Sequence, residues 1–123
     1  MSSEKELTTL PVAPLKLIVM QSCAELGKKV DDYIVQFRSK AHSEHKEGIE
    51  FKGYLEDSYI IDSVCPRFGT GEAKGQILGS VRGTDLYILT DVCNHSITYD
   101  VFGHTNYMSP DNHFQDLKRI IAA

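Results

Sequence analysis

The chain has 123 residues, of which 41% are hydrophobic, and this is enough to bury the core of one globular domain without disulfides. The formal net charge of -4 provides no basic face, which disfavours nucleic-acid binding, and no apolar run approaches the ~18 residues that span a membrane. Three widely spaced cysteines without a CxxC pair, and a polar start without signal-peptide order, predict a soluble protein of the cytoplasm.

The first elements expected along the chain are a strand and a helix, after a flexible leader over residues 1–14. The short run 15–20 is apolar and partly β-branched, which predicts a buried strand. Ser22 and Glu25 have the spacing of a capping box, which predicts that a helix begins there and ends near Arg38. The apolar face expected of this helix consists of Leu26, Val30, Ile34 and Phe37.

A polar stretch and further strands are expected next. Residues 39–50 are mixed in charge and have no apolar period, which predicts an exposed connection or a frayed helical extension. A strand is expected at 59–64, ended by Pro66. A second, more buried strand is expected at 85–90, and a weaker one over 73–79 lies between them.

A second helix is expected to begin at Pro110. Ser109 is a favourable N-cap, proline suits the first helical position, and Asp111 lies at the positive end of the helix dipole. The expected apolar stripe of this helix consists of Phe114, Leu117, Ile120 and Ile121. The alternation of strands and capped helices predicts an α/β fold with three layers, in which a mostly parallel central sheet has flanking helices.

The most informative segment combines a glycine-rich loop, a strand, a basic turn and a second strand. The loop is Arg-Phe-Gly-Thr-Gly-Glu at 67–72, and the turn is Ser-Val-Arg-Gly at 80–83. In order and spacing this segment resembles the ribose-phosphate pyrophosphokinases, in which a basic residue and Phe precede a small-acidic-small-Glu loop. The resemblance extends over most of the chain and implies that residues 15–123 are a phosphoribosyltransferase-like N-terminal domain.

The resemblance also implies two binding sites. In that family the Phe-containing loop reaches into a neighbouring subunit and holds the adenine of ATP, which implicates Phe68, Thr70 and Glu72. An aromatic face and polar edges are what adenine recognition requires. The same resemblance places Ser80 and Arg82 in the turn that binds phosphate groups of the allosteric effectors ADP and inorganic phosphate. A guanidinium fork beside a hydroxyl suits a phosphate.

For the complete enzyme, the resemblance implies transfer of the diphosphoryl group of ATP to ribose 5-phosphate, giving phosphoribosyl pyrophosphate and AMP. Magnesium would accompany ATP, and the enzyme would be a homo-oligomer. The family's ATP-clasping Arg-Gln loop, its metal-binding His and its loops for ribose 5-phosphate and pyrophosphate lie further along than these 123 residues. We therefore expect no catalytic or metal-binding residue here, because the C-terminal catalytic half is absent, and no activity of the chain alone.

Two departures from the family pattern predict a divergent branch. Thr70 stands where the family usually has Asp or Asn, which weakens the hydrogen bond expected to the adenine amino group. Residues 39–57 and 94–108 look like insertions relative to the common form of the family. Adenine selectivity, regulation and assembly are therefore left open.

The motif residues also have plainer interpretations. A lone aromatic such as Phe68 usually packs in a core, and single charges such as Glu72 and Arg82 are usually solvated, so only the combined pattern supports a site. Two other functions stay open at this point. One is a non-catalytic homologue or stand-alone nucleotide-binding or interaction domain of the same fold, and the other is a nucleotide-binding α/β module unrelated to the family.

The histidines and cysteines form no strong metal or nucleophile pattern. Four histidines lie in or beside polar stretches: His42, His45, His104 and His113. No cysteine or well-spaced third ligand accompanies His42 and His45, which lie in a charged stretch, so solvated side chains are expected there instead of a metal site. Cys93 has only His95 nearby, which predicts a half-buried structural cysteine.

Overall fold

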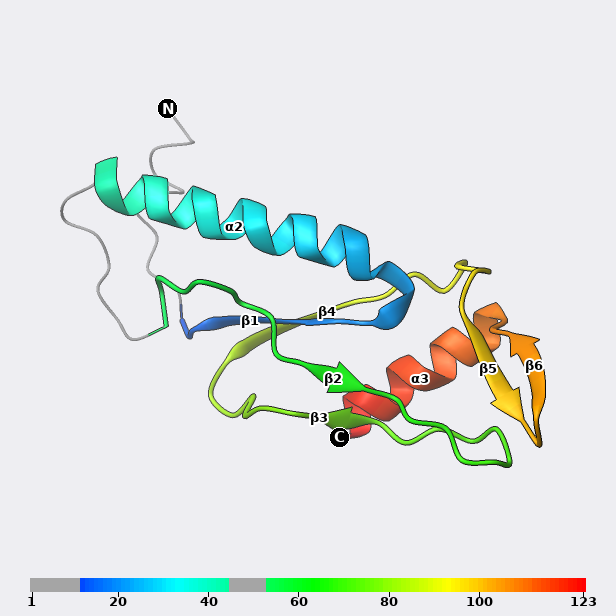
Figure 1. The fold of residues 1–123 in the computed structure, drawn as a ribbon. Coiled ribbons are helices and arrows are strands. Elements are labelled where there is room, and N and C mark those ends of the chain that lie inside the picture. The colour runs from blue at the N-terminus through cyan, green and yellow to red at the C-terminus, as the bar shows by residue number, and fades with distance from the viewer. Residues whose placement is uncertain (1–11, 45–52) are drawn as a thin grey trace.

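The computed structural model describes residues 12–44 and 53–123, so most of the predicted leader and part of the polar stretch lie outside the described residues (Figure 1). The elements in chain order are β1 (Leu15–Val19), the 3₁₀ helix η1 (Gln21–Cys23), α2 (Ala24–Glu44), β2 (Ser63–Val64), β3 (Gln76–Ile77), β4 (Asp85–Leu89), β5 (Thr98–Val101), β6 (His104–Tyr107) and α3 (Pro110–Ala122). Within the described ranges, the strands form small parallel and antiparallel sheets. This mixture is consistent with the predicted α/β class, whereas a three-layer, mostly parallel sheet is not confirmed.

The parallel part of the fold is centred on β1. This strand pairs with β4 in parallel along its whole length. On its other edge, the Leu17 N–H donates to the Tyr59 carbonyl and the Leu17 carbonyl accepts from the Ile61 N–H, both at 2.8 Å. After Ile61 the pairing partner changes, because the Asp62 carbonyl accepts from the Leu78 N–H. The chain therefore leaves β1 at this point and enters a hairpin. The prediction of one continuous strand at 59–64 is therefore wrong, although its first residues do lie beside β1.

The two long helices contact opposite faces of β1. At Gly27 of α2, an added Cβ would collide with the side chain of Val19, so glycine lets α2 approach β1 closely. On the other face, Ile18 and Ile120 of α3 belong to one buried cluster. Because successive strand side chains point to opposite faces, α2 and α3 lie on either side of β1, as Figure 1 shows.

The capping box predicted at the start of the first helix is wrong. Ser22 lies inside η1 and is buried, and its hydroxyl accepts from the Asp91 N–H at 2.9 Å and lies 3.3 Å from Thr90 Oγ1. No side chain caps η1, and α2 continues to Glu44, beyond its predicted end near Arg38. The serine thus stabilises the end of β4 instead of the start of a helix.

The face that helix α2 presents to the sheet only partly matches the predicted one. Of the predicted residues, Val30 and Ile34 are half-buried, but Leu26 and Phe37 are exposed. Gly27 and Asp31 are buried instead. The Asp31 carboxylate accepts from the Tyr59 N–H at 2.7 Å. This bond and the close approach at Gly27 fix the rotation of the helix, because a shift of one residue turns the buried face by about 100°.

The predicted start of the second long helix is confirmed. α3 begins at Pro110, Ser109 Oγ accepts from the Asn112 N–H at 3.1 Å, and Asn112 Oδ1 accepts from the Ser109 N–H at 2.8 Å. The predicted apolar stripe is buried only in part, because Ile120 is in the core but Phe114 is exposed.

Two antiparallel hairpins complete the described fold. β2 and β3 form the base of the first, so the weak strand predicted over 73–79 is confirmed only at Gln76–Ile77. β5 and β6 form the second, inside the 94–108 segment where the sequence predicted no strand. In the described parts of the chain, no helix is both long and apolar enough to cross a membrane.

Candidate functional site

The glycine-rich motif forms the tip of the β2–β3 hairpin, which we call the Phe68 loop (residues 67–73). The Phe68 N–H donates to the Glu72 carbonyl and the Gly71 N–H donates to the Phe68 carbonyl, both at 2.8 Å. Phe68 is 58% exposed, and Thr70 and Glu72 are exposed beside it. The three predicted ATP-binding residues thus lie together at one tip, and the predicted exposure of Phe68 is confirmed. Contact with a neighbouring subunit stays a prediction.

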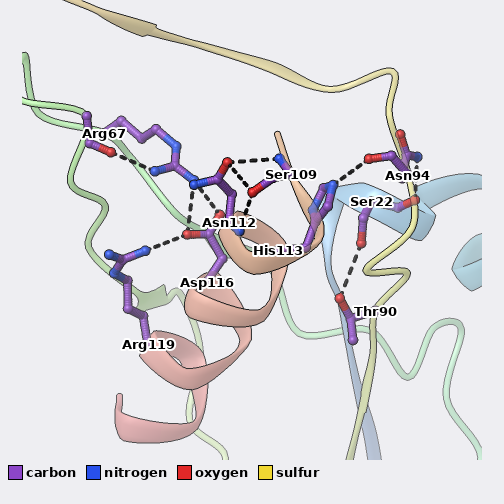
Figure 2. Close-up of polar contacts among 10 residues, drawn as sticks. Ser22, Arg67, Thr90, Asn94, Ser109, Asn112, His113, Asp116 and Arg119 are labelled. Carbon is purple, nitrogen blue, oxygen red and sulfur yellow. Dashed lines mark hydrogen bonds and ion pairs between the residues drawn. The ribbon is translucent and has the colours of Figure 1, made fainter. Parts of the chain in front are cut away.

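Arg67 fastens this loop to α3 and β5. Its side chain is only 12% exposed, and its guanidinium donates to the Gly71 carbonyl at 2.7 Å and to the two Asp116 carboxylate oxygens at 3.1 and 3.2 Å. The guanidinium carbon lies 4.3 Å from the centroid of the Tyr99 ring. Figure 2 shows Arg67 and Arg119 both reaching Asp116. One nearly buried side chain therefore connects the loop, a helix and a strand.

The carboxylate of Asp116 pairs with two arginine side chains, Arg67 and Arg119, at the base of the Phe68 loop. Asp116 is 7% exposed, and Arg119, one turn further along α3, contacts it at 2.8 Å. Loss of such a carboxylate would leave the charge of Arg67 without its partner in a nearly buried place, which is costly. Burial, and then the charge of Asp116, raise the pKa of the Cys65 thiol. The thiol therefore stays protonated at neutral pH.

We call the ion pair of Arg67 and Asp116 the anchor of the Phe68 loop. A cavity of about 670 Å³ lies beside this anchor, at the carboxyl ends of β1 and β4. Ligands of open α/β folds bind at this edge of the sheet. Polar side chains that line the cavity include Ser22, Arg67, Thr90, Tyr99 and Asp116. Arg67 is thus the motif residue that links the exposed loop to the cavity.

His113 ties the segment after β4 to α3. It is buried, its Nε2 lies 2.7 Å from the Asn94 carbonyl, and the Asn94 amide donates to the Ser22 carbonyl at 2.8 Å (Figure 2). Because a carbonyl only accepts, this contact assigns the ring proton to Nε2. The expectation of a half-buried Cys93 is wrong, because this cysteine is exposed.

The histidine stretches bring no metal site together in the described structure. Among residues 12–44 and 53–123, no three His, Cys, Asp or Glu side chains are placed to hold a metal ion. His45, which the sequence pairs with His42, lies outside the described residues.

The second predicted site is a tight turn directly before β4. The Val81 carbonyl accepts from the Thr84 N–H at 3.2 Å and from Thr84 Oγ1 at 2.7 Å, and Gly83 has a φ of 73°. Ser80 and Arg82 are exposed, and the described residues offer the Arg82 guanidinium no hydrogen bond or ion pair. The turn precedes β4, whereas the cavity lies at the end of β4. The structure therefore keeps the turn apart from the cavity, and its role in effector binding stays a prediction.

Sequence reasoning missed the anchor of the Phe68 loop. Arg67 and Asp116 are 49 residues apart, so no local pattern joins them. The one available signal was the pairing of Asp116 with Arg119 at a spacing of three on an expected helix. Tyr99 lies in a segment that the sequence treated only as an insertion.

Comparison with known proteins agrees with the motif. A family model described as the N-terminal domain of ribose phosphate pyrophosphokinase matches residues 15–123, a span that includes the Phe68 loop and its anchor. No curated protein and no solved structure gave a match. The chain therefore belongs to the family of ribose phosphate pyrophosphokinase N-terminal domains.

Proposed function

We propose that this chain is the ATP-contacting domain of a ribose-phosphate diphosphokinase, which converts ATP and ribose 5-phosphate into phosphoribosyl pyrophosphate and AMP. The family supports a transferase of nucleotide biosynthesis. The observation that carries the proposal is an exposed Phe68 ring on a loop that Arg67 fixes from below. An aromatic ring held out to solvent by an anchored loop suits a planar ligand better than core packing.

Recognition of adenine would use the ring face and the two polar side chains of the loop. Stacking of a base on an aromatic side chain contributes about 1–3 kcal/mol. The Glu72 carboxylate accepts from an exocyclic amino group, and the Thr70 hydroxyl either donates or accepts. The resemblance gives Asp or Asn at this place in the family, and a neutral hydroxyl makes a weaker bond to an amino group than an Asp carboxylate does. We therefore expect this loop to discriminate adenine from guanine less strongly than a loop with Asp in place of Thr70.

In this reaction the domain would contribute mainly by positioning ATP. The 1-hydroxyl oxygen of ribose 5-phosphate attacks the β-phosphorus of ATP and loses its proton, the bond between that phosphorus and the α–β bridging oxygen breaks, and AMP leaves. Proteins assist such transfers mainly by aligning the two substrates and neutralising phosphate charge. In this proposal magnesium accompanies ATP and neutralises charge on its phosphates.

Assembly and regulation extend the proposal. An ATP site completed by a second subunit needs a protruding aromatic, and the exposed Phe68 supports such a homo-oligomer. Ser80 and Arg82 supply an exposed hydroxyl and guanidinium for the phosphates of ADP or for inorganic phosphate. The contacts of α2 and α3 with opposite faces of β1 support the three layers predicted for the complete fold.

Nucleotide binding by Phe68→Ala tests the proposal. In an NMR titration of the ¹⁵N-labelled chain with MgATP, the dissociation constant should rise about 5- to 100-fold relative to wild type, because the stacking face is lost. Phe37→Ala is the matched control, since Phe37 is also an exposed phenylalanine but lies on α2. Unchanged affinity in Phe68→Ala would contradict the proposal and would favour a non-catalytic interaction domain of the same fold.

A further inference from the structure

The β5–β6 hairpin extends away from the buried core, and the two residues that flank it are hydrogen-bonded to each other. Where it begins and ends, the Met108 N–H donates to the Ile97 carbonyl at 2.8 Å. Within the described structure, no hairpin residue belongs to the buried core cluster, and Tyr107 on β6 is 72% exposed. The hairpin lies in the 94–108 segment, which the family resemblance predicts to be an insertion. Its role is therefore something other than closing the hydrophobic core.

The tip of this hairpin contacts the backbone of the Phe68 loop. The Phe102 N–H donates to the Gly69 carbonyl at 3.1 Å. Val101 packs so closely on the loop that a Cβ added at Gly71 would lie 2.7 Å from Val101 Cγ2. Phe102 has a φ of 49°, which is uncommon for a bulky residue, and its ring is 77% exposed. Because the Phe102 side chain is exposed, packing in the core does not offset the strain of this backbone conformation. The conformation does direct the Phe102 N–H at the Gly69 carbonyl, so the strain serves the contact with the loop.

The strand behind the tip contacts the anchor of the loop. The Tyr99 ring lies against the Arg67 guanidinium, whose carbon is 4.3 Å from the ring centroid. A cation over an aromatic face is attracted to it, and the ring covers the guanidinium that binds Asp116. The loop is therefore held from two sides, by Asp116 of α3 and by three residues of the hairpin.

We propose that the β5–β6 hairpin is the positioning element of the Phe68 loop, with Tyr99 acting through Arg67 and Val101 acting through Gly71. A loop that is already held in its binding geometry loses less conformational freedom when a ligand binds. Nucleotide affinity then depends on a hairpin that need not touch the nucleotide. Only the effect on nucleotide affinity rests on the proposed function. The positioning role itself is tested by amide exchange of the loop, which is measured without any ligand.

Excision of the hairpin is the most direct experiment. Residues 98–107 are replaced by Asn-Gly, a pair that favours a two-residue hairpin turn, and the existing bond between Ile97 and Met108 keeps the cut ends adjacent. Amide hydrogen exchange of Phe68 and Gly71 should become about tenfold faster or more, while exchange in β1 stays unchanged. The dissociation constant of MgATP should rise by about tenfold.

Point variants keep the test decisive if the excised chain fails to fold. Tyr99→Leu removes the aromatic face from Arg67 and should loosen the loop in the same direction, by a smaller factor. Tyr99→Phe keeps the face and should restore the exchange rates of wild type. Tyr107→Ala is the matched control, because Tyr107 is an exposed tyrosine on the neighbouring strand.

The outcomes separate this inference from the proposed function. Unchanged exchange of the loop amides in the folded excised chain, or in Tyr99→Leu, overturns the positioning role. Faster exchange with an unchanged MgATP dissociation constant upholds the positioning role and contradicts the adenine site at Phe68. Faster exchange together with weaker MgATP binding supports both.

Discussion

The two predicted binding segments are held in place by different means. The Phe68 loop is fixed by side chains from α3 and the β5–β6 hairpin, through the bonds of Arg67 to Asp116 and the contact of Val101 with Gly71. The turn that carries Arg82, in contrast, is closed by bonds within the turn itself. A ring that recognises one base needs a fixed direction, whereas a guanidinium that attracts phosphate acts through charge over a wider range of positions. The difference teaches that side-chain bonds to distant elements orient the first segment, whereas the hydrogen bonds that close the second are local, with Val81 packed against the core cluster.

The largest expected effect is that of Asp116→Ala, which would remove the shared partner of Arg67 and Arg119. The free energy of unfolding, measured by urea denaturation, should fall by about 3–5 kcal/mol, because the Arg67 charge stays nearly buried. Glu56→Ala is the control, since its 3.9 Å pair with Lys16 is more exposed, and it should cost about 1 kcal/mol or less. Similar small losses in both variants would contradict the anchoring role of Asp116.

A medium effect is expected on the reactivity of the cysteine beside the anchor. Burial and the charge of Asp116 raise the pKa of Cys65 above its ordinary value of 9.0, so little reactive thiolate forms near neutral pH. Iodoacetamide should therefore modify the exposed Cys93 well before Cys65, as followed by mass spectrometry. Equal rates for the two thiols would show that the foot of the loop is open to solvent.

The same raised pKa has a consequence for stability. The unfolded chain releases the Cys65 proton at a lower pH than the folded chain does. The stability that the neutral thiol contributes is therefore complete below the ordinary pKa of 9.0 and is lost as the pH rises through the higher pKa of the folded state.

The smallest expected effect on the fold is that of Arg82→Ala. The free energy of unfolding should stay within about 0.5 kcal/mol of wild type, because the side chain is exposed. Binding of inorganic phosphate should nevertheless weaken by about 10-fold or more, since a charge-assisted hydrogen bond is lost. Arg82→Lys, which keeps the charge without the fork, should bind with intermediate affinity. Phosphate affinity that is equal in all three proteins would remove this turn from the effector site.

Local signals predicted local structure in this chain. The N-terminus of α3 was predictable because its cap, Ser109 with Asn112, is complete within four residues. Ser22 offered the same kind of signal and failed, because its hydroxyl binds the Asp91 N–H, 69 residues away. The face of α2 was misplaced in part for a similar reason, since tertiary contacts at Gly27 and Asp31 set its rotation.

The candidate site divides in the same way. Phe68, Thr70 and Glu72 were predictable as a group because one short motif carries them. The anchor was not, because Arg67 meets Asp116 only after the chain has folded. In β5, Tyr99 and Val101 do alternate with polar residues. The hairpin was missed because HTNY in β6 lacks this alternation and because Phe-Gly is not the usual Asn-Gly or Asp-Gly turn.

The measurement that tests the account most directly maps two ligands on the wild-type chain by amide chemical shifts. MgATP should shift the amides of residues 68–72, and inorganic phosphate should shift those of residues 80–83 and leave the Phe68 loop unchanged. Such a result would show that the two segments bind their ligands separately. This is expected because the Phe68 loop lies at the tip of the β2–β3 hairpin, whereas the 80–83 turn lies directly before β4. MgATP shifts confined to residues outside 68–72 would contradict the assignment of the Phe68 loop to the nucleotide.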